Sequence, residues 1–509
     1  MKGNNQAYKL WLCLLCSFIL LPLEIQAQEK GDSITGKVHK IDEVTVTARR
    51  PPAKVTTGSP VQLINKEDIK NLGLQNMADA VRRFAGTNVR DYGGIGGLKT
   101  VSIRNLGAAH TAVSYDGVVV SNSQAGQIDI GRFSLDNVSS LSLAIGQDEN
   151  LLQPARLYAS AGVLSIETEK PVFENGKSSL SQIQIRGGAF GYIAPSIRRW
   201  QKLGEHTGLS VDASFIRADG NYPFTLENGK YITQEKRNNS DIHTWQGEAN
   251  LFHTFHDEST LDVKAYYFYS ERGLPGAVIL YNPKAEERLW DENFFSQVHY
   301  RTYWENNLSL LINGKFNWSQ SHYHDEGGKY PGGELNDRYF QREYYTSGAL
   351  LYTPTSHWSM VYAADYIYNN LNANTPNNTS PYRHSILQTA TLRYQTDNIT
   401  AVAILLGSIY LNGAKEGNGA ENRRKLSPSF SFSWKPCTDG QLYLRASYKD
   451  IFRVATFSEN YFDRMGSRDL RPEKAQQYNI GITYQSNIEG ELINKLQEVG
   501  FSYDGVVLN

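Results

Sequence analysis

Cysteine is nearly absent from this chain, with three residues in 509. Cys13 and Cys16 lie in an N-terminal apolar run that we expect to be cleaved off, which leaves Cys437 alone in the mature chain. A single cysteine cannot form an intramolecular disulfide. The protein is therefore not a small secreted domain held together by disulfides.

An excess of charge and long apolar runs are also lacking. The 51 Lys and Arg residues balance 52 Asp and Glu, for a formal net charge of -1. Nucleic-acid-binding domains usually carry a basic excess, so we expect no nucleic-acid partner. Beyond the first 27 residues, no segment offers the 18 or so consecutive apolar residues that indicate a transmembrane helix. A protein that crosses a membrane with alternating strands leaves no such run.

The glycine-rich stretch DYGGIGGLKT, residues 91–100, is not a phosphate-binding loop. A P-loop needs Gly directly before Lys, and here Leu98 separates Gly97 from Lys99. The dinucleotide pattern G-x-G-x-x-G fails because Lys99 occupies the third glycine position. Strand-like segments follow instead of a helix whose N-terminus would face a phosphate. We therefore expect no nucleotide site there.

The N-terminal residues have the pattern of a secretory signal peptide, residues 1–27. Lys2 and Lys9 lie before an apolar run over residues 10–23, and the small residue Ala27 follows this run. Residues 28–52 form a polar linker that contains the alternating stretch EVTVTA, ended by Pro51 and Pro52. This stretch is predicted to be extended and able to pair with another chain's sheet edge, or else to be an ordinary linker strand.

Residues 53–172 are predicted to form a compact α+β unit. Leu74, Met77, Val81 and Phe84 follow one stripe of a helix, and Gly86 stands where a C-terminal cap is expected. Four short strand-like segments come next: TVSIR, TAVSYDG, SSLSLAI and GVLSIET. The apolar stripe is interpreted as core packing.

Residues 173–509 are predicted to form a partial β-barrel, and from about residue 178 long alternating segments recur. In LSLLINGKFNW, residues 308–318, Leu308, Leu310 and Ile312 share one face with Phe316 and Trp318, and polar residues alternate with them. Roughly 14 such segments lie between residues 178 and 488. An alternation of apolar and polar residues over so many long strands indicates a transmembrane antiparallel β-barrel. A soluble β-sandwich shares the alternation but does not need so many long strands in series.

Four motifs in order resemble the TonB-dependent outer-membrane receptors. SIRNLGAAHTAVSYDG and AGVLSIETEK are similar to motifs of that family's plug domain. YKDIFRVATFSENYF with LRPEKAQQYNIGITY resembles a barrel motif, and EVTVTA resembles the TonB box. The resemblance implies a β-barrel with an N-terminal α+β plug, located in the outer membrane. It also implies that the glycines of GGIGG serve tight turns and that Lys99 is a solvated residue at a strand start.

The resemblance implies roles for three groups of residues. The TonB-binding segment is Glu43, Val44, Thr45, Val46, Thr47 and Ala48. The plug apex that faces the ligand comprises Asp91, Tyr92, Gly93, Asn122, Ser123 and Gln124. The family's usual second plug arginine is missing, because Ile145 stands at its expected position, so Arg104 and Asp116 are the candidates for buried, paired charges that anchor the plug.

The expected function is TonB-dependent uptake of a large, scarce nutrient, with cobalamin preferred and a ferric siderophore as the alternative. The spacing of DGVVVSNSQAGQIDIGRFSLDNVSSL is most similar to cobalamin receptors. TonB with its inner-membrane energising complex is the expected partner, and the resemblance leaves room for a surface lipoprotein. A passive porin or adhesin is the alternative from another class. Deleting EVTVTA would discriminate the two.

No catalytic set and no cofactor are expected. His322 and His324 with the nearby Asp325 and Glu326 suggest a metal site, but receptor loops often have this composition, so no dedicated metal site is predicted. His253 and His256 are expected to end a strand. An enzyme would need a nucleophile and base that no local motif supplies.

The C-terminal segment departs from the family pattern. Barrels that hold a plug close with about 22 strands. The stretch GELINKLQEVG, residues 490–500, loses the alternation and is predicted to be a short polar helix, and the chain ends without a terminal aromatic residue. We therefore expect a truncated receptor with open strand edges, which assembles poorly because hydrocarbon does not tolerate unpaired edges.

Overall fold

The computed structural model describes residues 61–485 and 498–508, apart from residues 105, 147–149, 174–175, 277–283, 328–329, 331, 377, 437–441 and 463–464. These residues belong to one compact unit that begins at Pro51. The predicted signal peptide, the EVTVTA segment and Cys437 lie outside the described residues. Among the described residues, no helix is both long and apolar enough to cross a membrane.

The N-terminal part, called the plug below, is built on a five-stranded sheet in the order β1-β6-β7-β4-β5. Strand β4 is parallel to β7, and the other pairs are antiparallel. The strands are β1 (Val61–Asn65), β4 (Thr111–Tyr115), β5 (Val118–Val120), β6 (Val138–Ile145) and β7 (Gly162–Thr168). A separate hairpin joins β2 (Thr87–Asp91) to β3 (Lys99–Ile103).

Short helices accompany this sheet. They are α2 (Lys66–Asn71) and α3 (Met77–Val81), with the 3-10 turns η2 (Ala108–His110), η3 (Ile130–Arg132), η4 (Leu135–Asn137) and η5 (Ala155–Ala159). Met77 and Val81 of the predicted stripe are fully buried, and Phe84 is 4% exposed. The stripe is therefore core packing, as predicted, although α3 is shorter than the stripe. The four predicted short strands correspond to β3, β4, β6 and β7.

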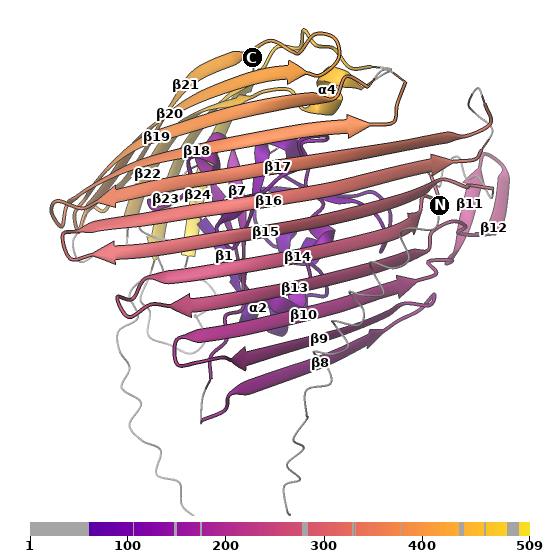
Figure 1. The fold of residues 1–509 in the computed structure, drawn as a ribbon, viewed down its shortest axis with the longest axis horizontal. Helices are drawn as coiled ribbons and strands as arrows, with labels where there is room; N and C mark the ends of the chain where they lie inside the picture. The colour runs from indigo at the N-terminus through magenta and orange to yellow at the C-terminus, as the bar shows by residue number, and fades with distance from the viewer. Residues whose placement is uncertain are drawn as a thin grey trace, which may run out of the picture. The chain divides into compact units, whose positions relative to one another are not determined.

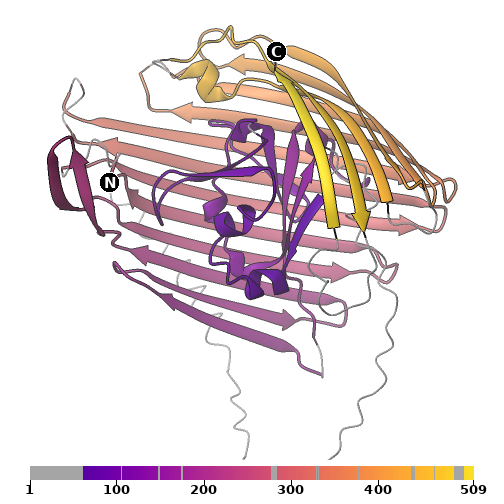
Figure 2. The ribbon, with the colours of Figure 1, turned by 180° about the vertical axis from the view of Figure 1, so that it is seen from behind.

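The rest of the chain forms a 15-stranded antiparallel sheet in which sequence neighbours pair, with β11 and β12 set aside as a hairpin (Figure 1). Its strands are β8 (Ser179–Gly187), β9 (Ile193–Lys202), β10 (Thr207–Ala218), β13 (Ile242–Thr254), β14 (Thr260–Gly273), β15 (Arg288–Trp304), β16 (Leu308–Asp325), β17 (Leu335–Tyr352), β18 (Trp358–Ala373), β19 (Pro381–Gln395), β20 (Ile399–Ala414), β21 (Arg423–Trp434), β22 (Leu442–Arg453), β23 (Glu473–Gln485) and β24 (Glu498–Leu508). The hairpin consists of β11 (Pro223–Asn228) and β12 (Tyr231–Lys236). Figure 2 shows the plug lying against the inner face of this sheet.

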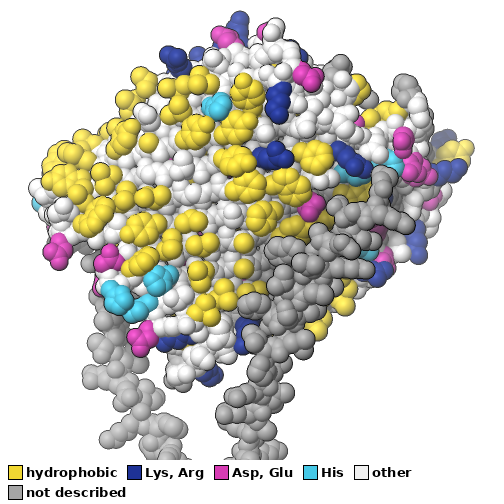
Figure 3. Space-filling model, viewed as in Figure 1, with side chains coloured by type: hydrophobic (Ala, Val, Ile, Leu, Met, Phe, Trp, Pro, Cys, Tyr) yellow, Lys and Arg dark blue, Asp and Glu magenta, His cyan; other side chains and the backbone are white. Residues whose placement is uncertain are grey.

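The two faces of the large sheet differ in polarity, and β16 shows the rule. Asn313, Lys315 and Asn317 are buried on the inner face, whereas Ile312, directly before them, is 44% exposed on the outer face. Hydrophobic side chains spread over the outer face of the neighbouring strands (Figure 3). An apolar outer face and a polar inner face are what a membrane-spanning sheet requires. The predicted alternation is confirmed.

The large sheet has two edges. Within the described residues β8 pairs only with β9, and β24 pairs only with β23. Fourteen of the strands lie in the predicted region between residues 178 and 488. The helix predicted for residues 490–500 is wrong at its end, because residues 498–500 belong to β24; the remainder lies outside the described residues. Pairing along β23 outweighs the weak local pattern of this segment.

A substitution at Leu405 tests whether the outer face of the large sheet contacts lipid. It lies on β20 with 46% of its surface exposed, among other apolar residues. We expect Leu405→Arg to lower the free energy of unfolding by about 2–4 kcal/mol in a lipid bilayer, because an arginine near the bilayer midplane is costly. Urea titration of the bilayer-embedded protein measures the change. Leu405→Phe is the matched control, and equal stabilities of the two variants would contradict a lipid-facing position.

Candidate functional site

The glycine-rich loop between β2 and β3 folds around a buried lysine. Lys99 is 8% exposed, and its Nζ donates to the carbonyl oxygens of Gly94 at 2.7 Å and Gly97 at 3.3 Å. The same Nζ lies 3.7 Å from Oδ1 of Asp91. The prediction that Lys99 is solvated is wrong, because the loop carbonyls and Asp91 together supply the partners that a buried ammonium needs.

Close backbone approach explains the glycines of this loop. A Cβ on Gly97 would lie 2.4 Å from the backbone nitrogen of Gly93, which no side chain tolerates. Gly93 itself has a φ of 141°, a conformation that favours glycine. The turn leaves Asp91 and Gly93 exposed, and Tyr92 is 57% exposed. The first half of the predicted apex is thus a braced loop that presents an aromatic side chain to solvent.

The second half of the predicted apex is half-buried against the large sheet. Asn122 Oδ1 accepts from the backbone N–H of Gln124 and Ala125, at 3.1 and 3.0 Å, which fixes the turn. Gln341 of β17 then bonds the loop at three points: Oε1 accepts from Ser123 Oγ and Gln124 N, and Nε2 donates to Gln124 Oε1. Residues 122–124 therefore form a docked loop, unlike residues 91–93.

A short helix between β22 and β23, α4 (Phe457–Tyr461), holds the same loop from the other side. The N–H groups of Phe457 and Ser458 donate to the carbonyl oxygens of Ser123 and Gln124, at 3.0 and 2.9 Å. Amides in the first turn of a helix have no partner within the helix, so they are free for this contact. The plug loop and the β22–β23 connection therefore behave as one assembly.

This helix could have been found in the sequence. Thr456 and Glu459 form a reciprocal capping box at its N-terminus, and T-x-x-E is a known sequence signature of a helix start. The fit against the plug is close, since a Cβ on Gly126 would lie 2.6 Å from Cγ2 of Thr456. Which plug loop the helix would meet had no local signal, because the two segments are more than 300 residues apart.

A chain of charged groups links this connection to η2 of the plug. His110 Nε2 lies 2.6 Å from Glu473 Oε2. Arg453 Nη1 and Nη2 donate to the two carboxylate oxygens of Glu459, each at 2.9 Å, and its Nε donates to Glu473 at 2.9 Å. Arg453 thus ties both ends of the β22–β23 connection to each other, and His110 ties them to the plug.

Asp116, the other predicted anchoring residue, is paired with the large sheet. It has a φ of 48° and accepts from Thr168 N at 2.7 Å and from Thr168 Oγ1 at 2.8 Å. Lys264 Nζ of β14 lies 2.9 Å from Asp116 Oδ2. Burial alone would raise the pKa of Asp116, but Lys264 and the Thr168 hydrogen bonds outweigh it and lower this pKa. The carboxylate is therefore held ionised.

Two neighbours complete the Asp116 cluster. Glu248 contacts Lys264 and accepts from the Tyr115 hydroxyl at 2.6 Å. The ammonium of Lys264 also lies 4.5 Å from the centre of the Tyr115 ring, a favourable cation–π distance. Each buried charge of the cluster has at least one partner of opposite sign.

A second anchor, centred on Arg156 of η5, was missed in the sequence. Its Nη1 lies 3.1 Å from Glu343 Oε2 on β17, and Glu343 Oε1 lies 3.2 Å from Lys315 Nζ on β16. The backbone N–H groups of Ala155 and Arg156 both donate to Asp365 on β18. Arg156 therefore joins Arg104 as an arginine that connects the plug to the sheet. A single sequence shows no sign that Arg156 faces carboxylates on strands about 200 residues away.

Arg104 itself meets an amide. It has a φ of 50°, its backbone N–H donates to Gly86 O at 2.9 Å, and its guanidinium donates to Asn479 Oδ1 on β23. Ile145, where a second arginine was expected, is buried in the plug core. Arg104 therefore contacts the large sheet, and its role in anchoring the plug stays a prediction.

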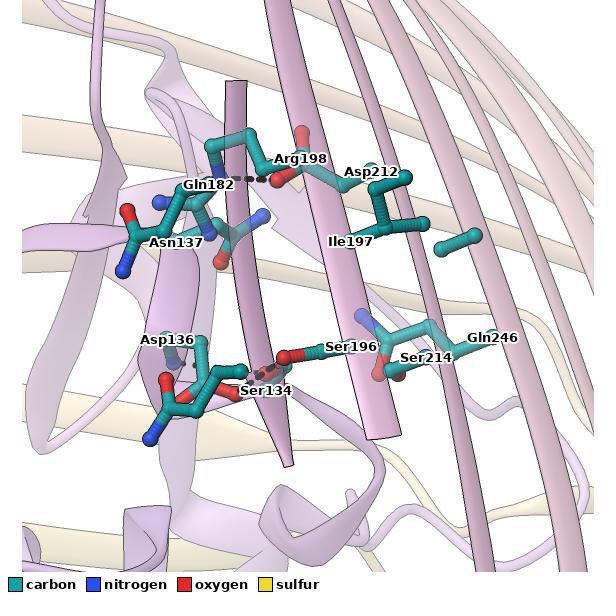
Figure 4. Close-up of a pocket in the computed structure, with 12 residues that line it drawn as sticks. Ser134, Asp136, Asn137, Gln182, Ser196, Ile197, Arg198, Asp212, Ser214 and Gln246 are labelled. Carbon is teal, nitrogen blue, oxygen red and sulfur yellow. Dashed lines mark hydrogen bonds and ion pairs between the residues drawn. The ribbon is translucent and has the colours of Figure 1, made fainter. Parts of the chain in front are cut away.

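The opposite end of the plug contacts the first strands of the large sheet (Figure 4). Asp136 of η4 accepts from Ser196 Oγ on β9 at 3.2 Å and from Arg186 on β8. Nearby, Arg198 pairs with Asp212. The cavity between these side chains measures about 20 Å³, which is room for about one water molecule. This contact is therefore structural and offers no ligand site.

The histidine-containing loop brings three possible metal ligands together. Ligand atoms of His324, Glu326 and Glu334 lie within 4.8 Å of one another, and both glutamates are exposed. His322 bonds Asn336 at 2.9 Å instead of joining them. Exposed carboxylates around one histidine do not establish a metal site. His253 lies one residue before the end of β13, near where it was expected, and His256 follows that strand.

Comparison with known protein families decides the family. Residues 53–153 match the TonB-dependent receptor plug domain, and residues 196–492, more than half of the chain, match the TonB-dependent receptor-like β-barrel. The chain belongs to the TonB-dependent receptor family. Members of this family are receptors and transporters and do not constitute an enzyme class. The predicted fold class, a β-barrel sheet with an α+β plug, is confirmed.

Individual relatives are distant in sequence. The vitamin B12 transporter BtuB of Photobacterium profundum is 22% identical over 505 residues, which cover 93% of this chain and 71% of the relative. Among solved structures, the FrpB iron transporter of Neisseria meningitidis has a TM-score of 0.68 at 13% identity, over 88% of this chain and 73% of that one. The copper transporter OprC has a TM-score of 0.67 at 14% identity, over 84% and 71%. These structures share the receptor fold.

Glu343 tests the second anchor. It is 2% exposed and faces two cations, Arg156 and Lys315. We expect Glu343→Gln to lower the free energy of unfolding by about 3–5 kcal/mol, because it leaves buried positive charges without a counter-charge. Urea titration followed by protease digestion of the released plug measures this. Glu416→Gln, in an exposed loop, removes the same charge and should change stability by less than about 0.5 kcal/mol. Equal effects would contradict the anchor.

His110 predicts a pH dependence. Burial lowers the pKa of His110 below its usual value, although Glu473 partly opposes this. The unfolded state therefore takes up a proton more readily, so stability should fall as the pH decreases below about 6.5. Comparing urea midpoints at pH 7.5 and 5.5 for the wild type and His110→Gln measures it. If the urea midpoint of the wild type depends on pH no more steeply than that of the variant, His110 is not responsible.

Proposed function

We propose that this receptor takes up a large, scarce nutrient across the outer membrane in a TonB-dependent manner, and that the nutrient is cobalamin. The observation that carries the choice of cobalamin is the relative described as a vitamin B12 transporter, whose match extends over 93% of the chain. The spacing of the stretch DGVVVSNSQAGQIDIGRFSLDNVSSL supports it. The signal peptide at residues 1–27, the linker at 28–52, the plug at 53–172 and the barrel at 173–509 are parts of this proposal.

A ferric siderophore is the second candidate cargo. Solved structures similar in fold include FpvA bound to an iron–pyoverdine complex, with a TM-score of 0.64. Equilibrium binding of labelled cobalamin and of labelled ferric chelates to outer membranes that contain the receptor separates the two. Saturable binding of cobalamin supports the first candidate, and binding of a ferric chelate alone supports the second.

The geometry of the apex suggests how a bound nutrient would act on the plug. Tyr92 stands exposed on the braced loop, whereas Ser123 and Gln124 are bonded to both β17 and α4. A nutrient that touches residues 122–124 would therefore disturb α4 and Gln341 at the same time. This couples the outward-facing loops to the plug without any chemical reaction.

Transport then requires the plug to leave its contacts with the sheet. In this proposal the segment Glu43–Ala48 adds as a strand to TonB, and the pull is transmitted to the plug. The contacts that must separate are mostly hydrogen bonds and ion pairs, such as Arg156 with Glu343 and Asp116 with Lys264. Water can replace such partners, so the separation costs less than exposing an equally large apolar contact.

Deleting Glu43–Ala48 tests energy coupling. We expect the deletion to abolish cobalamin uptake and to leave binding to outer membranes unchanged, because the apex loops are untouched. Uptake and binding of labelled cobalamin in the same cells measure both. A variant that replaces the six residues by a Gly/Ser segment of equal length controls for linker length and should also be inactive. Uptake that survives the deletion would support the passive porin or adhesin instead.

A further inference from the structure

A cavity of about 220 Å³ lies between the plug apex and the large sheet. On the plug side it is lined by His110, Thr111 and Asn122. On the sheet side it is lined by residues that include Arg383 and Ser385 of β19. Cavities that hold whole drug-sized ligands usually measure about 300–1,000 Å³. This cavity is therefore suited to one functional group of a larger molecule.

Arg383 differs from the other two arginines that line the cavity. Arg156 is paired with Glu343, and Arg453 is paired with Glu459 and Glu473. Arg383 donates instead to neutral oxygens, from Nη2 to the carbonyl of Ala455 at 2.7 Å and from Nε to Asn412 Oδ1 at 2.6 Å.

The described surroundings of Arg383 give it no direct ion pair. Glu459, the carboxylate whose charge acts on it, is bound to Arg453. The ion pairs at this cavity in the described part of the chain are those of Arg156 and Arg453. The guanidinium carbon of Arg383 stands 5.4 Å from the ring centre of Phe457, which provides a weak cation–π contact. A partly buried cation of this kind gains more from an anion than an exposed one does, because less water screens the interaction.

The plug wall of the cavity adds a second observation. His110 Nδ1 and Thr111 Oγ1 are buried atoms without a hydrogen-bond partner in the described structure. Buried polar atoms normally have a partner, and orphaned ones often mark a site that something else completes. Two such atoms belong to residues that line the same cavity as Arg383.

We propose that this cavity, named here the Arg383 pocket, binds an oxyanion group of the transported nutrient, with Arg383 as its counter-charge. The inference rests on the proposed uptake function and narrows the chemistry of the cargo. A planar guanidinium can offer two parallel N–H groups to a carboxylate or a phosphate. Cobalamin carries such a group as its phosphodiester, and ferric hydroxycarboxylates carry it as carboxylates.

The test compares three labelled probes on outer membranes that contain the full chain: cyanocobalamin, ferric citrate, and ferrichrome, which has no oxyanion. We expect Arg383→Gln to weaken binding of the oxyanion probe that the wild type recognises by about 10-fold or more, because a charge-assisted hydrogen bond is lost. Arg383→Lys should weaken this binding less than Arg383→Gln does, because the positive charge remains. Arg393→Gln is the matched control, because Arg393 lies on the same strand and does not line the cavity.

The outcomes separate this inference from the proposed function. If the wild type binds an oxyanion probe and Arg383→Gln binds it equally well, the inference alone is wrong. If the wild type prefers ferrichrome, the inference is wrong and so is the choice of cobalamin, whereas uptake of a ferric siderophore is supported. If the wild type binds none of the three probes, both are overturned.

A second measurement is needed if the variant does not assemble. Heat-modifiable mobility in gels shows whether it has assembled. Inorganic phosphate, at constant ionic strength, should compete with the oxyanion probe for the wild-type receptor, whereas chloride should not. Competition by phosphate no stronger than by chloride would overturn the inference without any variant.

Discussion

Buried ion pairs join the plug to the sheet, and the rest of the structure depends on them. The inner face of the large sheet carries charged side chains, such as Lys264 and Glu343, that are almost inaccessible to water. An isolated charge at such a position would cost several kcal/mol. Asp116 and Arg156 of the plug supply the opposite charges. Lys264 and Glu343 also have partners within the sheet, Glu248 and Lys315. The plug therefore adds a further charge to each of these buried pairs and is bound to the sheet through them.

The contact between plug and sheet is not uniform around the plug. Toward β14 and β15 it is apolar around one ion pair, Asp116 with Lys264. Tyr266 and Phe295 join the plug core there, and Tyr115 lies 6.2 Å from each of their ring centres. Toward β17, β18 and α4 it consists of ion pairs and hydrogen bonds. Polar contacts can be exchanged for water at small net cost, whereas apolar contacts cannot. In the proposed cycle, the plug would separate first on its polar side.

Local patterns predicted what depends on local physics. The alternation in β16 and the stripe through Met77 and Val81 follow from strand and helix periodicity, and both hold. Contacts between distant segments were not predictable from one sequence. Lys99 looked solvated because its loop carbonyls gather only after the turn closes. The ion pair of Arg156 and the contact between α4 and the apex loop likewise depend on which strands face the plug. The periodicity of the sequence carries no information about this arrangement.

The most direct test of the electrostatic account is a double-mutant cycle between Arg156 and Glu343. The free energy of unfolding of the bilayer-embedded protein is measured for the wild type, Arg156→Met, Glu343→Gln and the double variant. If the two charges hold the plug to the sheet, the coupling energy should be at least about 1.5 kcal/mol, as for other close charge pairs at interfaces. Effects that add to within about 0.5 kcal/mol, as for independent sites, would contradict the account.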